Sequence, residues 1–259
     1  MNSPARPTVA IVQARMSSTR LPGKVLLRSC GKPLLQHLIE RARRCPQIDQ
    51  LVVATSTDAS DDPLQSLCDG LGVPCHRGSL DDVLDRFMGA ARPLAPGWVV
   101  RLTGDCPLID PDVIGRVVSA AREPGVDYAS NALVPTFPDG LDVECMRAEV
   151  LEQAWREARK PSEREHVTPF IHTQPERFAL RQVRQEADLS ALRWTVDEPS
   201  DFVFVSQVFE HLYPVQPDFR MNDVLELLRR EPRLARINTG LARNEGYARS
   251  LAAEAGAAA

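Results

Sequence analysis

Short apolar runs alternate with amphipathic stretches along the first half of the chain. Residues 9–12, 50–55 and 98–102 are the apolar runs, and their length predicts buried strands. Residues 34–42 and 83–91 carry apolar side chains at helical spacing, which predicts helices packed on those strands. Because strands that alternate with helices form parallel sheets, we expect ligands to bind beyond the carboxyl ends of the strands.

The second half of the chain continues with less regular strands and ends in helices. A helix is expected over 61–71, a short strand over 73–76 and another helix from residue 111, capped by Asp110. Strands are expected over 127–134, 137–146, 178–183 and 192–196, and helices over 147–159, 201–212, 221–229 and 244–254. The sequence therefore predicts one three-layer α/β domain with a Rossmann-like, mostly parallel sheet and a small extension of mixed strands.

Charge and cysteine spacing exclude several classes of function. The 259 residues carry a formal net charge of -4, without the basic field that DNA or RNA binding requires, so we expect no nucleic-acid partner. The six cysteines form no C-x-x-C pair, which predicts neither a zinc site nor a disulfide framework. With no apolar signal segment and no run long enough for a membrane helix, we expect a cytoplasmic protein without a membrane partner.

Cationic side chains gather in the loop that follows the first predicted strand. Arg15, Arg20 and Lys24 lie among small hydroxyl residues, and Pro22-Gly23 forms a turn before Lys24. Main-chain N–H groups and fixed positive charge stabilise phosphates, so this loop is a candidate triphosphate site. The alternative is an ordinary basic surface loop, because the sequence has neither the G-x-x-x-x-G-K-[ST] nor the G-x-G-x-x-G pattern.

Single aspartates follow two of the predicted strands. Asp105 comes after the strand over 98–102, at the edge where a parallel sheet binds ligands. Carboxylates are the hard oxygen ligands that Mg²⁺ prefers, so Asp105 is a candidate metal ligand. Asp197 follows the strand over 192–196 and lies near Pro199, where the pattern alone favours a helix cap. Asp82, in contrast, is interpreted as a charge at the start of a helix.

Two polar clusters lie in the less regular part of the chain. Asp142 and Glu144 alternate with apolar residues, so both carboxylates share one face of a predicted strand, either as a binding surface or as a solvated face. Arg164 and His166 lie beside carboxylates such as Glu165, an arrangement that suits an acidic ligand. A structural histidine is the alternative for His166.

The loop over 14–24, ARMSSTRLPGK, resembles the signature loop of the sugar-acid cytidylyltransferases, the family of the CMP-KDO and CMP-sialate synthetases. It is closest to the branch of the spore coat polysaccharide biosynthesis protein F. Segments 104–108 and 194–202 resemble the two metal-binding aspartate motifs of the family, and 138–144 and 165–169 resemble the same branch. The resemblance implies a nucleotide-diphospho-sugar transferase fold, similar to that of GT-A enzymes.

The resemblance also implies roles for individual residues. Arg15 and Lys24 would hold the triphosphate of CTP as catalytic residues, and Asp105 and Asp197 would bind Mg²⁺. The implied nucleotide-binding residues are Ala14, Arg15, Ser17, Arg20, Lys24, Arg77, Thr103 and Gly104. The implied acceptor-binding residues are Asn131, Asp142, Glu144, Arg164, Glu165 and His166. Thr103 departs from the family, in which a glutamine often stands at this position, so the preference for a base stays open.

The implied activity is transfer of CMP from CTP to an acidic sugar with release of pyrophosphate, which would supply surface polysaccharide or glycoconjugate synthesis. Residues 8–125 would bind the nucleotide, 126–196 would bind the acceptor and form a homodimer, and 197–259 would add the second aspartate and the last helices. Three alternatives remain at this point. They are a GT-A-type glycosyltransferase that uses Asp142 and Glu144, a uridylyl- or guanylyltransferase, and a non-catalytic nucleotide-binding subunit.

Overall fold

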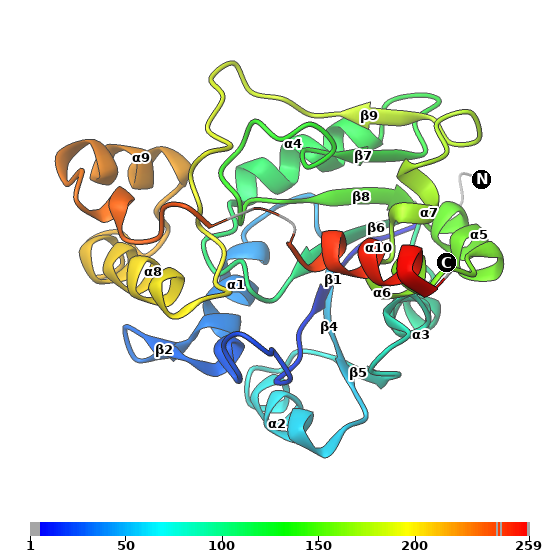
Figure 1. The fold of residues 1–259 in the computed structure, drawn as a ribbon, viewed down its shortest axis with the longest axis horizontal. Helices are drawn as coiled ribbons and strands as arrows, with labels where there is room; N and C mark the ends of the chain where they lie inside the picture. The colour runs from blue at the N-terminus through cyan, green and yellow to red at the C-terminus, as the bar shows by residue number, and fades with distance from the viewer. Residues whose placement is uncertain (1–5, 242, 244, 258–259) are drawn as a thin grey trace.

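The computed structural model describes residues 6–241, 243 and 245–257 (Figure 1). Seven strands in these ranges form one sheet in the order β5-β4-β1-β6-β8-β7-β9. The strands are β1 (Thr8–Gln13), β4 (Gln50–Ser56), β5 (Cys75–Gly78), β6 (Trp98–Thr103), β7 (Tyr128–Ser130), β8 (Glu144–Arg147) and β9 (Leu180–Gln182). β8 is antiparallel to both of its neighbours, and the other pairs are parallel. The sheet is therefore mixed but mostly parallel, as predicted.

Ten α-helices are described around this sheet and a two-stranded ribbon of β2 (Arg28–Ser29) and β3 (Lys32–Pro33). The first five are α1 (Leu34–Ala42), α2 (Asp62–Gly70), α3 (Val83–Ala91), α4 (Pro111–Ala121) and α5 (Ala148–Glu157). The others are α6 (Pro161–His166), α7 (Pro169–His172), α8 (Pro199–Leu212), α9 (Met221–Arg230) and α10 (Glu245–Ala257). None of them is long and apolar enough to cross a membrane.

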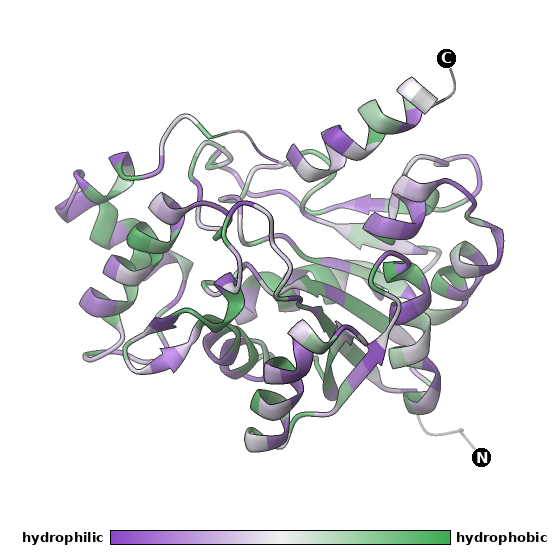
Figure 2. Cartoon of the chain, turned by 60° about the horizontal axis from the view of Figure 1, so that its bottom comes forward, coloured by the Kyte–Doolittle hydropathy of each residue, from purple (hydrophilic) through white to green (hydrophobic). Residues whose placement is uncertain are grey.

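The central strand β1 buries both of its faces. Ala10 and Val12 pack into one apolar cluster with α1, α2, α4, α8 and α9. Val9 and Ile11 pack into a second cluster with α3, α5 and α7. Figure 2 shows the hydrophobic colour concentrated on the central strands. Because successive side chains of a strand point to opposite faces, this division confirms the three-layer architecture.

Acidic caps fix where two of the helices begin. The side chain of Asp82 accepts a hydrogen bond from the backbone N–H of Asp85 at 2.9 Å, at the start of α3. Asp110 accepts from the N–H of Asp112 at 2.8 Å, at the start of α4. Both caps confirm the interpretation of these aspartates from sequence. The cap of α4 also ends the loop that carries Asp105 away from β6.

Two predicted strands differ from the described sheet, one over most of its length and the other entirely. Most of the segment over 137–146 is a loop, and only its end forms β8. The segment over 192–196 is extended, but it makes just one isolated bridge, between Asp139 and Arg193. Gly140 explains the loop, because its φ is 106° and a Cβ there would lie 2.5 Å from the backbone nitrogen of Thr195. Two segments therefore run side by side without joining the sheet.

The chain after α9 returns to the carboxyl edge of the sheet. Figure 1 shows α10 crossing this edge near β1 and β6, beside α6, far along the chain from those strands. The predicted helix over 244–254 corresponds to α10, although residue 244 itself lies outside the described residues. The last helix thus lies over the part of the sheet where ligands are expected.

Candidate active site

Two adjoining pockets open beyond the carboxyl ends of β1 and β6. The first, here called the loop pocket, has a volume of about 430 Å³ and is lined mainly by the loop after β1, the loop after β6 and α10. The second, here called the acidic pocket, has a volume of about 460 Å³. Arg20, Thr103, Asp105, His166 and Asp197 line both pockets. The two cavities therefore meet at the two predicted metal ligands.

The loop after β1 is held in place by a buried carboxylate. The N–H of Met16 donates to Asp61 Oδ1 at 2.7 Å, and Ser56 donates to the other carboxylate oxygen of Asp61. Burial by itself would raise the pKa of Asp61, but the hydrogen bonds from Ser56 and Met16 outweigh it and lower the pKa. Gly23, with a φ of 70°, provides the turn that brings Lys24 inward.

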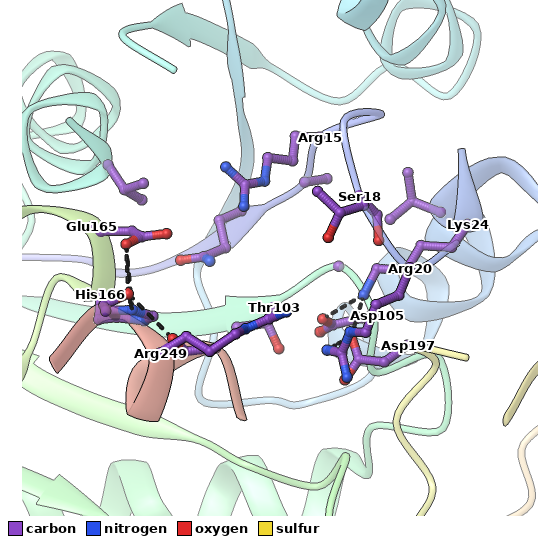
Figure 3. Close-up of a pocket in the computed structure, with 18 of the residues that line it drawn as sticks. Arg15, Ser18, Arg20, Lys24, Thr103, Asp105, Glu165, His166, Asp197 and Arg249 are labelled. Carbon is purple, nitrogen blue, oxygen red and sulfur yellow. Dashed lines mark hydrogen bonds and ion pairs between the residues drawn. The ribbon is translucent and has the colours of Figure 1, made fainter. Parts of the chain in front are cut away.

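Lys24 lies between the two predicted metal ligands, as Figure 3 shows. Its Nζ is 2.9 Å from Asp105 Oδ2 and 2.7 Å from Asp197 Oδ1. Burial would lower the pKa of Lys24, but attraction to Asp105 and Asp197 outweighs it and raises the pKa. Burial would likewise raise the pKa of Asp105, yet the Lys24 charge brings it down from 3.8 to about 2. Lys24 and Asp105 are therefore both held in their charged forms.

A buried arginine sets the position of Asp197. Arg193 is hydrogen-bonded to Asp197 at 3.2 Å, to Asp139 at 3.0 Å and to Asp201 at 2.9 Å. The carboxylate of Asp201 also accepts from the N–H groups of Asp197 and Glu198, both at 2.9 Å. Glu198 and Asp201 together cap α8. The role of helix cap that the sequence suggested for Asp197 is therefore filled by these two neighbours. The Asp197 side chain is left facing Lys24.

Asp197 does not follow a strand of the sheet, which corrects the prediction for 192–196. It lies near Asp105 because the N–H of Val196 donates to the carbonyl oxygen of Asp105 at 2.8 Å. Gly104 allows the loop after β6 to approach β1, since a Cβ there would lie 2.9 Å from the carbonyl oxygen of Gln13. The pair of carboxylates is thus assembled by loop contacts and not by strand pairing.

The residues around Lys24 fit a divalent cation. An ammonium already lies between the carboxylates of Asp105 and Asp197, so this position favours positive charge and offers the oxygen ligands that Mg²⁺ prefers. Within the described ranges, no group of three or more acidic, histidine or cysteine side chains is placed to hold a metal. The remaining ligands would therefore have to be water and phosphate oxygens, as is usual for Mg²⁺.

The acidic pocket contains two carboxylates in opposite electrostatic states. Asp142 is hydrogen-bonded to Arg243, yet burial outweighs this pairing and raises the pKa of Asp142 from 3.8 to about 7. Burial would also raise the pKa of Glu144, but the charge of Arg101 and two hydroxyl donors lower it instead. Tyr128 and Thr168 provide those hydroxyl groups. Glu144 is therefore the fixed charge, and Asp142 changes its charge near neutral pH.

Most of the predicted site residues line these pockets. The loop pocket contains Ala14, Arg15, Arg20, Lys24, Thr103, Gly104, Asp105, Glu165, His166 and Asp197. The acidic pocket contains Asp142, Glu144 and His166 among its lining residues. The geometry therefore brings together the residues implied for nucleotide, metal and acceptor.

Four predicted residues do not line either pocket: Ser17, Arg77, Asn131 and Arg164. Arg77 donates to Asp62 at 2.6 Å and to two backbone carbonyls after β4. Asn131 is buried, where it donates to Leu141 and accepts from Val143 at 2.8 Å each. Arg164 is hydrogen-bonded to Asp82 at 2.5 Å. These contacts hold the framework around the pockets, and a direct role for these residues in binding stays a prediction.

Two arginines of the loop pocket were not predicted as site residues. Arg86 is only 2% exposed and donates to the carbonyl oxygen of Ser79 at 2.6 Å. Burial, together with the charge of Arg15, lowers the pKa of Arg86 from 12.5 to about 10. A charged residue on the apolar face of the predicted helix over 83–91 was the signal that could have identified it. Arg249, on the exposed side of α10, left no such signal in the pattern.

The sequence profile described as Cytidylyltransferase matches residues 9–209, which include the loop after β1, both candidate metal ligands and most of the residues that line the acidic pocket. The chain belongs to the cytidylyltransferase family. It is similar to the spore coat polysaccharide biosynthesis protein SpsF of Bacillus subtilis, with 33% identity over 86% of this chain and 94% of that protein.

A 3-deoxy-manno-octulosonate cytidylyltransferase of Anaeromyxobacter sp. (strain K) is 40% identical over 49% of this chain and 52% of that protein. Among solved structures, a cytidylyltransferase from Leptospira borgpetersenii superposes with a TM-score of 0.85 at 29% identity, covering 92% of this chain and all of that one. These findings confirm the predicted family and the nucleotide-diphospho-sugar transferase fold. The chain is thus an enzyme of the cytidylyltransferase family, and the alternatives of a glycosyltransferase and a non-catalytic subunit are excluded.

Proposed function

We propose that this cytidylyltransferase transfers CMP from CTP to a hydroxyl group of an acidic sugar and releases pyrophosphate. The observation that carries the proposal is the cluster of Lys24, Asp105 and Asp197 where the two pockets meet, with Arg15 and Arg20 beside it. A triphosphate in the loop pocket and an acceptor in the acidic pocket would then meet at the two carboxylates. The reaction requires that arrangement, because the acceptor hydroxyl must reach the α-phosphate.

The chain's own residues would act mainly by holding charge in place. Arg15 and Lys24 would bind the β- and γ-phosphates and stabilise the pyrophosphate as it leaves. Asp105 and Asp197 would hold Mg²⁺, which supplies positive charge to the phosphates when it is bound. Arg193 and Asp201 would keep Asp197 oriented while ligands come and go. Nothing in this scheme requires a nucleophile from the protein, since the acceptor provides it.

The proposal of an acidic acceptor rests on one side chain and one relative. Arg101 lines the acidic pocket, and its Nε is buried without a hydrogen-bond partner among the described residues. A guanidinium of this kind suits a carboxylate of the acceptor. The relative named for 3-deoxy-manno-octulosonate acts, by its name, on such a sugar acid. We also propose a homodimer and a role in surface polysaccharide synthesis, following the resemblance to the spore coat branch.

Calorimetric titration with CTP, UTP, GTP and ATP, each with Mg²⁺, tests the donor. We expect selective binding of CTP, and a preference for UTP or GTP would contradict the cytidylyl assignment. Pyrophosphate release with CTP and a panel of acidic, neutral and amino sugars then tests the acceptor. Turnover restricted to neutral or amino sugars would overturn the acidic acceptor but leave the donor assignment intact. Light scattering after size-exclusion chromatography tests the dimer, and a monomeric mass would contradict it.

A further inference from the structure

The helix α10 lies outside the residues that the family profile matches, yet it lines both pockets. The profile ends at residue 209, whereas α10 covers Glu245–Ala257. Glu245 and Tyr247, in its first turn, line the acidic pocket, and Gly246 between them lines both pockets. Arg249 and Ser250, further along the helix, face the loop pocket. The helix therefore contributes different residues to the two sides of the site.

Four polar contacts fix the position of α10 over the site. Arg20, in the loop after β1, forms an ion pair with Glu245 at 2.9 Å. Ser250 donates to Glu165 at 2.8 Å and is hydrogen-bonded to His166 at 3.0 Å. The N–H of Ser162 donates to Glu254 at 2.5 Å. Contacts at its beginning, middle and end thus hold the helix against both the cationic loop and α6.

These contacts place Arg249 next to an anchored residue. Ser250 is the neighbour of Arg249 and carries the hydrogen bonds to α6. Figure 3 shows the Arg249 side chain extending from α10 into the space between His166 and Thr103, with Arg15 on another wall of the pocket. The guanidinium is therefore directed into the loop pocket although the helix itself lies at the surface.

Arg249 and Arg15 differ from the other cations of the loop pocket. Lys24 and Arg20 form ion pairs with carboxylates, and Arg86 donates to backbone carbonyls. Within the described part of the chain, neither the side chain of Arg15 nor that of Arg249 donates a hydrogen bond or forms an ion pair. Two arginines that line one pocket without partners repel each other, and an anion bound between them would offset this repulsion. A polyphosphate has the charge and the acceptor oxygens that two guanidinium groups can share.

We propose that Arg249 is a ligand of the terminal phosphates of the nucleotide, supplied by α10 to face Arg15 across the loop pocket. This inference rests on the proposed function, because it takes CTP as the donor. It extends that function by making α10 part of the nucleotide site. The first turn of the same helix faces the acceptor side, so one element would contact both substrates.

Affinity measurements with whole and shortened ligands test this role. Arg249→Ala should weaken the binding of CTP with Mg²⁺ about tenfold, the loss expected for a charged hydrogen bond to phosphate. CMP lacks the β- and γ-phosphates, so its affinity should change less than about twofold. Arg249→Lys should restore part of the CTP affinity, because it keeps the charge. Alanine favours helices, so the substitution should not disturb α10.

Arg236→Ala serves as the matched control, since Arg236 is exposed and lines neither pocket. It removes the same charge and should leave both affinities unchanged. Unchanged CTP binding in Arg249→Ala, or an equal loss for CTP and CMP, would overturn the assignment of Arg249. Pyrophosphate provides a probe without a nucleoside. If the wild-type protein binds pyrophosphate but not CTP, the proposed function fails. The effect of Arg249→Ala on pyrophosphate affinity then still decides the role of Arg249. If the wild-type protein binds neither, both are overturned.

Discussion

Lys24 Nζ lies 2.7 Å from Asp197 Oδ1, although 173 positions separate the two residues in the chain. The ammonium occupies the place between Asp197 and Asp105 where the proposed metal would bind. The lysine therefore stabilises two neighbouring carboxylates that would otherwise repel each other. It also competes with the metal for the same oxygens, and the first predictions follow from this double role.

Asp105→Asn should abolish most metal-dependent turnover without unfolding the protein. The amide keeps the shape of the side chain but removes the charge that would hold Mg²⁺, so we expect the barrier to rise by about 3 kcal/mol or more. Release of pyrophosphate measures the activity, and circular dichroism checks the fold. Asp81→Asn, at an exposed position outside both pockets, is the control. Near-normal turnover in a folded Asp105→Asn protein would rule out this aspartate as a metal ligand.

Lys24→Ala should have opposite effects on the two ligands. CTP affinity should fall, because a phosphate-binding charge is lost. The affinity for Mg²⁺ alone should rise, because the carboxylates of Asp105 and Asp197 lose the ammonium that competes with the metal. Calorimetry with each ligand measures both effects, and Lys32→Ala, a lysine paired with Glu40 away from the pockets, is the control. A loss of Mg²⁺ affinity in Lys24→Ala would contradict the competition.

Asp201→Ala should destabilise the protein and weaken metal binding together. Asp201 is fully buried, and its removal takes away one of the carboxylates paired with Arg193 and the acceptor of the Asp197 N–H. Breaking a buried ion pair on one side costs about 3–5 kcal/mol, so the free energy of unfolding should fall by that order. Urea unfolding measures the loss. A change below about 1 kcal/mol would show that Arg193 is held by its other partners.

Asp142 should give the stability of the protein a dependence on pH between about 4 and 7. Its pKa is raised from 3.8 in the unfolded chain to about 7 in the folded protein. Its contribution to the free energy of unfolding is therefore full below pH 4 and is lost as pH rises toward 7. In Asp142→Asn this contribution is missing, so the wild-type protein should lose stability relative to the variant across that range. Urea unfolding at several pH values measures the difference, and a constant difference would contradict the raised pKa.

The local parts of the site could be predicted from the sequence. Arg15, Lys24 and Asp105 follow strands β1 and β6, whose apolar runs are clear, and parallel strands bring such residues to one edge of a sheet. The helix caps at Asp82 and Asp110 were also evident, because capping depends on neighbouring residues. Strand and helix patterns therefore predicted the position of this half of the site, while its role in binding stays a prediction.

The other half depends on contacts that no local pattern encodes. The alternation of apolar residues over 192–196 predicted a strand, but this segment pairs with the loop around Gly140 and not with the sheet. Asp197 reaches Lys24 through Arg193 and Asp201, which a pattern of single positions does not connect. Arg249 lies on a helix whose exposed face resembles any solvated surface. These positions are determined by tertiary packing, which overrides local preference.

The ion pair between Arg20 and Glu245 closes a loop of 225 positions, and that length has a consequence for how the protein folds. Contacts between distant positions form slowly, since the entropy of closing long loops must be overcome first. The strands β1, β4 and β6 all lie within residues 8–103, whereas the proposed site also requires Asp197 and then α10. During synthesis on the ribosome, the cationic loop after β1 would therefore be present long before Asp197 and α10, which complete the proposed site. Nucleotide binding would begin late in synthesis and in a single step, and it would indicate that the chain has folded through α10.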